Sequence, residues 1–166
     1  MSVTRVLGID PGSRKLGWGV VEREGTRVRH VAHGVISVSS DELADRLVDI
    51  DAALREVIAT HAPDIASVET MFFAKNAQSA AKLGHARGVV LLRLRAAGLP
   101  VHEYAPARVK RAVTGSGRAD KRQVAMVISR ILALDVVPPS DAADALAVAL
   151  THINAAPFAE AVLRRR

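Results

Sequence analysis

Four carboxylates in this sequence stand at positions where an acidic side chain needs a physical reason. Asp10 and Glu69 each end a short apolar run that is typical of a buried strand. Asp141 and Asp144 lie three residues apart, which places them on one face of the apolar helical stretch 141–150. Burying an unpaired carboxylate costs several kcal/mol, so we expect this helix to keep two of them only beside a cation.

Carboxylates that converge without cysteine or clustered histidine suit hard, oxygen-preferring ions such as Mg²⁺ or Mn²⁺. Two such ions about 4 Å apart hold a scissile phosphate, activate water and stabilise the leaving 3′ oxygen. Each acid also has an ordinary explanation. Asp141 would complement a helix dipole, Asp10 precedes a Pro-Gly turn, and Glu69 would be a surface charge. Together they favour metal-dependent phosphodiester hydrolysis.

Composition narrows the class of protein. The 166 residues are 49% hydrophobic and contain no cysteine, which indicates one folded domain and excludes disulfide scaffolds, zinc fingers and thiol catalysis. Lysine and arginine number 23 against 17 acidic residues, a net charge of +6. Residues 73–130 hold twelve basic residues and two acidic ones, the footprint of a polyanion partner or of a solvated helix face. Apolar runs too short for a bilayer and the lack of a signal segment predict a cytoplasmic protein without membrane contact.

The order of expected elements is that of an α/β domain over residues 1–156, followed by a flexible tail at 157–166. Strands are expected at 3–10, 16–22, 27–37, 65–69 and 101–104. Helices are expected from the Ser39–Glu42 capping box to 61 and at 76–97, 106–113, 121–132 and 141–154. The first three strands form antiparallel hairpins, whereas strands reached through helices run parallel to a neighbour. The result is a five-stranded mixed sheet flanked by helices, in which Asp10 and Glu69 end neighbouring strands.

Four segments together resemble the RuvC family of Holliday-junction resolvases, whose fold is ribonuclease H-like. The resemblance covers about residues 4–152, and its motifs are Leu7–Ser13, Val68–Glu69 with Phe72–Asn76, Tyr104–Pro106 with Val109–Lys110, and Asp141–Leu146.

The resemblance implies that Asp10, Glu69, Asp141 and Asp144 are catalytic carboxylates that bind Mg²⁺, with two ions per site. Some family members carry histidine at the position of Asp141. The resemblance also implies that Phe72 stacks on an unpaired base. We predict that the residues contacting DNA are Phe72, Lys75, Lys110, Arg118, Lys121 and Arg122.

The family's reaction is a pair of symmetric nicks across a four-way DNA junction, leaving 5′-phosphate and 3′-hydroxyl ends in recombination and repair. The resemblance also implies that the protein works with the RuvA–RuvB branch-migration complex. Two nicks on a two-fold substrate favour a homodimer. Ala80, Gly84 and Gly88 form a small-residue ridge that suits either a dimer seam or packing on the chain's own sheet.

Three other functions remain open on the sequence. A junction-binding module would carry the same basic segment with a purely structural acidic cluster. A related ribonuclease H-like nuclease would act on RNA precursors. An actin-like ATPase would place an Asp and a Gly after its first strand, but no second phosphate-binding glycine loop is evident.

Overall fold

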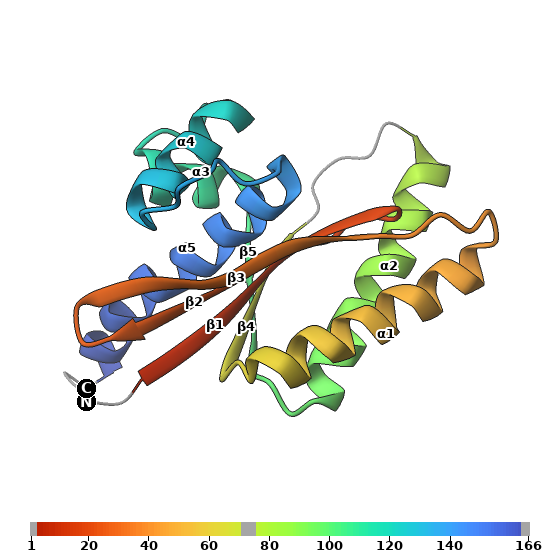
Figure 1. Ribbon diagram of the computed structural model, residues 1–166, viewed down its shortest axis with the longest axis horizontal. Coiled ribbons are helices and arrows are strands. Elements are labelled where there is room, and N and C mark those ends of the chain that lie inside the picture. Colours follow the sequence, from red (N-terminus) through yellow and green to blue (C-terminus); the bar gives the residue numbers. More distant parts are fainter. Residues whose placement is uncertain (1–2, 71–75, 164–166) are drawn as a thin grey trace.

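A central sheet with helices on both faces forms the protein (Figure 1). The computed structural model describes residues 3–70 and 76–163, with side-chain surroundings described as far as residue 155. The strands are β1 (Val3–Asp10), β2 (Lys15–Glu24), β3 (Arg27–Ser37), β4 (Ile65–Glu69) and β5 (Val101–Tyr104). The helices are α1 (Leu43–His61), α2 (Ala77–Ala96), α3 (Pro106–Thr114), α4 (Lys121–Ile131) and α5 (Ser140–Leu163).

The sheet has the expected mixed directions. Its order is β3-β2-β1-β4-β5. The pairs β1–β2 and β2–β3 are antiparallel, whereas β1–β4 and β4–β5 are parallel. The predicted five-stranded sheet with three antiparallel strands is therefore confirmed.

Two local expectations were wrong. Helix α1 begins at Leu43 after Glu42, and no side chain caps it, so Ser39 and Glu42 form no capping box. The reason is that Arg46, on the first turns of α1, donates to the carbonyls of Ser40 and Asp41 and fixes the entering loop in another way. Helix α5 continues to Leu163, beyond the end expected at residue 154.

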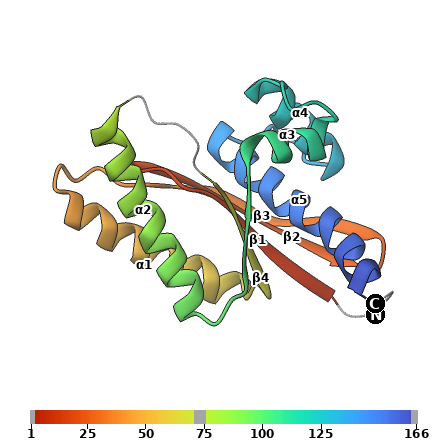
Figure 2. The ribbon, with the colours of Figure 1, turned by 180° about the vertical axis from the view of Figure 1, so that it is seen from behind.

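The sheet separates two hydrophobic cores. Helices α1 and α2 cover one face, and α3, α4 and α5 cover the other (Figure 2). Side chains alternate along β1, so Leu7 and Ile9 enter the core beneath α1 and α2, whereas Val6 joins the core beneath α5. Both faces of β1 are thus buried, and its carboxyl end is held rigidly.

Glycines on the sheet let α5 lie against the backbone of β1 and β2. A Cβ atom on Gly8 would lie 2.0 Å from the Ala145 carbonyl oxygen, and one on Gly17 would lie 1.8 Å from that of Asp141. Any larger residue would push the helix away. Gly17 is also the register partner of Asp10, so this contact brings the start of α5 to the end of β1.

Helix α2 presents its small-residue ridge to solvent. It buries Ala86, Val90 and Leu94 against the sheet. A Cβ on Gly84 or Gly88 would meet no atom within 4 Å, so the ridge does not pack on the chain's own sheet. Among the described residues, no helix combines the length and apolar character that a membrane crossing requires.

Candidate active site

Three elements bring the four predicted carboxylates to one end of the sheet. Asp10 and Glu69 are the last residues of the parallel neighbours β1 and β4, whose preceding residues are register partners. Asp141 and Asp144 lie in the first turns of α5, which contacts β1, β2 and β4. The charges of Glu69, Asp141 and Asp144 all act on Asp10. The spatial arrangement therefore joins acids that are far apart along the chain.

A cavity of about 590 Å³ opens beside Asp10 and Glu69. Lys110 of α3 provides a cation in its wall, and Thr70 follows Glu69 there. The remaining lining residues are Pro11, Leu83, Ala105, Pro106, Ala107 and Gly117. The positions of Thr70, Leu83, Ala107 and Gly117 in the cavity wall were not predicted from the sequence. Of these four, only Gly117 has a local sequence signal, because the segment 114–117 (Thr-Gly-Ser-Gly) is typical of a flexible loop and precedes a basic helix.

Negative charge in this region is incompletely compensated. Burial, followed by the charges of Glu69 and Asp144, raises the pKa of Asp10 to about 8. Burial and the charge of Asp144 also raise the pKa of Glu69, although a side-chain hydrogen bond with Asp10 acts in the opposite direction. Burial likewise raises the pKa of Asp144. A cation bound among these acids would offset their mutual repulsion.

Lys121 provides the nearest counter-charge. Its Nζ lies 3.2 Å from Oδ2 of Asp144. The side chain of Lys121 is 67% exposed and that of Asp144 is 17% exposed, so the carboxylate is largely buried and its cation faces solvent. Asp120, which precedes Lys121, caps α4 through a reciprocal pair of hydrogen bonds with Gln123 and thereby fixes the start of the helix at Lys121.

The predicted DNA contacts are only partly brought together. Lys110 lines the carboxylate cavity, and Lys121 pairs with Asp144. Arg118 and Arg122 are exposed around the start of α4, where Arg118 lines a separate cavity. Phe72 and Lys75 lie outside the described residues, so the stacking and contact roles of these two residues stay predictions.

Tyr104 holds the strand end that carries Glu69. It is the register partner of Glu69, and its carbonyl oxygen accepts hydrogen bonds from the backbone N–H and the hydroxyl of Thr70 at 2.8 and 3.3 Å. Its own hydroxyl lies 2.8 Å from Nδ1 of His152 on α5. The sheet end and the helix that carries Asp144 are therefore tied together behind the pocket.

The candidate metal ligands have the chemistry that a divalent cation requires. They are carboxylate oxygens on rigid elements, with raised pKa values that a bound cation would relieve. Within the described residues, no three acidic or histidine side chains are yet gathered closely enough to hold a metal ion. Asp10 and Glu69 share a side-chain hydrogen bond, and the charge of Asp144 acts on both. Rotation of these three side chains would complete a set of oxygen ligands.

Carboxylates at the ends of two parallel strands, with further acids from a helix lying over them, define a ribonuclease H-like nuclease fold. The yeast mitochondrial Holliday junction resolvase Ydc2 shares this fold, with a TM-score of 0.64 at 14% identity over 89% of this chain and 77% of that one.

Comparison with known proteins then gives the family. The family model described as "Crossover junction endodeoxyribonuclease RuvC" matches residues 6–152. The chain is 64% identical to the RuvC of Sorangium cellulosum over 95% of this chain and 89% of that protein. The structure of T. thermophilus RuvC in complex with Holliday junction substrate matches with a TM-score of 0.87 and 41% identity, covering 94% of this chain and 96% of that one. The chain belongs to the RuvC family of crossover junction endodeoxyribonucleases.

Proposed function

We propose that this protein resolves four-way DNA junctions by paired, symmetric, metal-dependent nicks that leave 5′-phosphate and 3′-hydroxyl ends. The observation that carries the proposal is that Asp10 and Glu69 line one pocket and that the charge of Asp144 acts on both, with too little positive charge to offset the three acids. Such a pocket is costly for the fold alone, and it fits the chemistry of the family to which the chain belongs.

The proposed catalytic and ligand residues are Asp10, Glu69, Asp141 and Asp144. Asp10 and Glu69 are fixed by the sheet and line the cavity where a phosphate would enter. Asp144 forms an ion pair with Lys121 and would hold the metal together with Asp10 and Glu69. Mg²⁺, bound as two ions, would supply activation of water and stabilisation of the leaving 3′ oxygen. Mn²⁺ has the same preference for oxygen ligands.

The cations around the pocket would hold the DNA backbone. Lys110 lines the cavity wall, and its charge opposes in part the rise in the pKa values of Glu69 and Asp144. Lys121 would contact a phosphate of the bound strand. Arg118 and Arg122 extend the positive surface along the start of α4. These contacts position the strand without reading its sequence.

A two-fold substrate calls for a two-fold enzyme, and the open ridge of α2 is the proposed seam. Gly84 and Gly88 leave room for another helix to approach closely, and the neighbouring Leu92 is 69% exposed. Gly88→Glu should shift the sedimentation coefficient from dimer to monomer without lowering the melting temperature. A monomeric wild-type protein at working concentration would contradict this seam.

The family also suggests the protein's cellular setting. We propose that residues 1–156 act as one nuclease domain in the cytoplasm and that the enzyme works with a RuvA–RuvB branch-migration complex. Enhancement of cleavage by purified RuvA–RuvB on a junction that must migrate would test the partnership.

The decisive test is cleavage of a synthetic mobile four-way junction. The wild-type protein should nick two opposite strands in Mg²⁺ and none in EDTA. Asp10→Asn should bind the junction and cut neither strand. Asp41→Asn, at an exposed acid that pairs with Arg14 and does not line the pocket, is the matched control and should cut normally.

The same assay separates the competing functions. Junction binding without cleavage in Mg²⁺ or Mn²⁺ would indicate a binding module with a structural acidic cluster. Faster cleavage of an RNA precursor than of the junction would indicate an RNA nuclease. Either result would overturn the proposed function.

A further inference from the structure

A second groove lies away from the carboxylate pocket. It has a volume of about 770 Å³ and lies between the first half of β3 and the α4–α5 connection at residues 131–139. It shares no lining residue with the cavity beside Asp10 and Glu69. Nothing in the proposed nuclease chemistry uses it.

The groove follows an open edge of the sheet. Its lining includes the four consecutive residues 27–30 of β3. Because successive side chains of a strand point to opposite faces, contact with four in a row means that the groove runs along the strand edge. β3 is the outermost strand of the five, so in the described part of the chain its outer backbone groups pair with no other strand. Such an edge is a template for an added strand.

The opposite wall is apolar and exposed. Ile131, Val136 and Val137 are 49, 76 and 53% exposed, and all three line the groove. Large aliphatic side chains with this much exposure are few in the described residues, so their gathering in one groove is a mark of an interaction surface.

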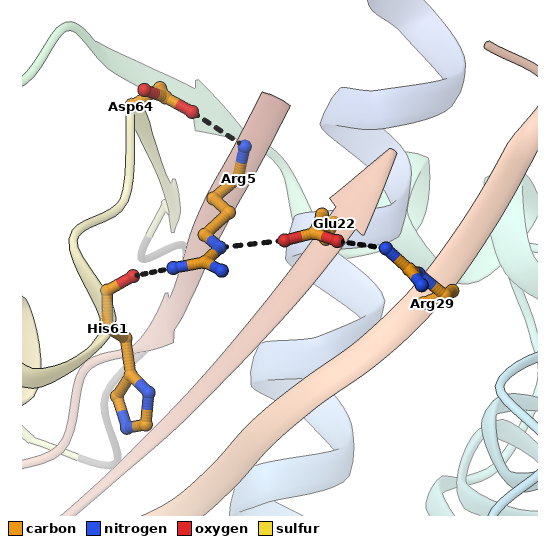
Figure 3. Close-up of polar contacts among 5 residues, drawn as sticks. All are labelled: Arg5, Glu22, Arg29, His61 and Asp64. Atoms are coloured by element: carbon orange, nitrogen blue, oxygen red, sulfur yellow. Dashed lines mark hydrogen bonds and ion pairs between the residues drawn. The ribbon is translucent and has the colours of Figure 1, made fainter. Parts of the chain in front are cut away.

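The charge at the strand edge is positive. Arg27 and Arg29 both line the groove, and Arg29 is oriented by its ion pair with Glu22, as Figure 3 shows. His30 and His33 lie with Nε2 and Nδ1 2.8 Å apart, and burial lowers both pKa values, so near neutral pH the two arginines dominate. Among the described lining residues the acidic side chain is Asp135 alone.

We propose that this groove binds an extended segment of a partner protein, which adds a strand to the β3 edge and carries alternating acidic and apolar side chains. The acidic side chains would meet Arg27 and Arg29, and the apolar ones would cover Val136 and Val137. Like charge opposes pairing of β3 with β3 of a second copy. A nucleic acid would leave the exposed aliphatic wall facing its phosphates.

The test uses the whole protein and a fluorescein-labelled synthetic peptide that alternates glutamate with valine. Anisotropy should show saturable binding, weaker by about tenfold or more when lysine replaces each glutamate. Val136→Glu should weaken binding of the glutamate peptide to a similar degree. Val48→Glu, the same change at a valine 66% exposed on α1, should leave it unchanged. Amide exchange at residues 27–30 should slow when the peptide binds.

Several outcomes would overturn the proposal. They are no saturable binding, equal binding of the lysine peptide, or an equal effect of Val48→Glu. A change in oligomeric state or in duplex binding caused by Val136→Glu would assign the groove to a second copy or to DNA instead. Val136→Glu should cut naked junctions at the wild-type rate, so a failure here is distinguishable from a failure of the nuclease function.

Discussion

Carboxylates near the two ends of β1 have opposite electrostatic surroundings. Near its beginning, Arg5 donates from Nε to Glu22 at 2.8 Å, and Arg29 holds the other oxygen of Glu22 (Figure 3). Arg5 also donates to the His61 carbonyl, and its backbone N–H donates to Asp64. The hydrogen bonds from the two arginines lower the pKa of Glu22. This buried acid is satisfied by the protein itself.

At the other end, Asp10 faces other acids. Burial and the charges of Glu69 and Asp144 raise its pKa to about 8, and the charge of Lys121 acts in the opposite direction. One end of β1 therefore contributes to a complete charge cluster, formed by Arg5, Glu22 and Arg29. The other end contributes to an incomplete one, formed by Asp10, Glu69 and Asp144. The comparison teaches that burial of an acidic side chain is not by itself a sign of function. An acidic side chain that is buried without enough neighbouring positive charge is such a sign.

The strongest expected contrast comes from removing one charge in the incomplete cluster. Glu69→Gln keeps the shape of the side chain and removes a proposed metal ligand. We expect cleavage of the four-way junction to fall about a thousandfold, which corresponds to several kcal/mol of transition-state stabilisation. Junction binding should persist in a gel-shift assay. Cleavage within a few fold of wild type would remove Glu69 from the proposed catalytic set.

His152 offers a third kind of buried titratable group, paired with the neutral hydroxyl of Tyr104. Burial, together with His102, lowers its pKa to about 4 from 6.5. The unfolded chain therefore takes up a proton first, and stability is lost as the pH falls from about 6.5 toward 4. The loss attributable to this group is about 3 kcal/mol.

His152→Gln removes that titration and keeps a polar partner for Tyr104. His30 and His33, whose pKa values are also lowered, titrate in both proteins. Urea unfolding at a series of pH values should give a shallower acid loss for the variant. Parallel curves for the two proteins would mean that His152 does not carry the effect.

Substitution of Lys121 tests whether the negative charge of Asp144 is balanced by this one cation. Lys121→Met keeps much of the side-chain length and removes the ion pair with Asp144. Because the lysine is 67% exposed, its contribution is screened by solvent. We expect cleavage to fall by about tenfold in single-turnover kinetics. Lys82→Met, at an exposed lysine on α2, should have no comparable effect.

The smallest expected effect on catalysis comes from the complete cluster. Glu22→Gln leaves Arg5 and Arg29, which are 39 and 49% exposed, to be hydrated in part. The melting temperature should fall by a few degrees at neutral pH, with the cleavage rate of the folded protein unchanged. Since the pKa of Glu22 is lowered, this difference should shrink as acid protonates the wild-type carboxylate. A cleavage defect in Glu22→Gln would break the contrast between the two ends.

Much of the fold follows from local patterns. Strand alternation and helical periodicity gave the order of the elements, and the strands reached through helices were correctly expected to be parallel. The entry to α1 could not be predicted from Ser39 and Glu42, because Arg46 decides it through contacts that only the folded loop creates. The end of α5 was also missed.

The sequence allowed the four acidic residues of the candidate site to be predicted, but not the pocket wall around them. The close contact of Gly17 with α5, the 3.2 Å pair of Lys121 with Asp144 and the wall formed by Leu83 all join residues distant along the chain. Gly17 was a usable signal, since glycine inside a strand marks close backbone approach. Lys121 and Leu83 gave no local sign of their contacts.

The central claim is that the carboxylates at the Asp10 end of β1 bind a divalent cation. Melting curves of wild type and Asp10→Asn at pH 9 test it most directly. The raised pKa means that the unfolded chain holds fewer protons, so ionising Asp10 costs stability as the pH rises through about 8. In EDTA, Asp10→Asn should melt above wild type; Mg²⁺ should raise the melting temperature of wild type and change that of the variant little. An Asp10→Asn protein that melts below wild type in EDTA, or an equal response of both proteins to Mg²⁺, would contradict the account.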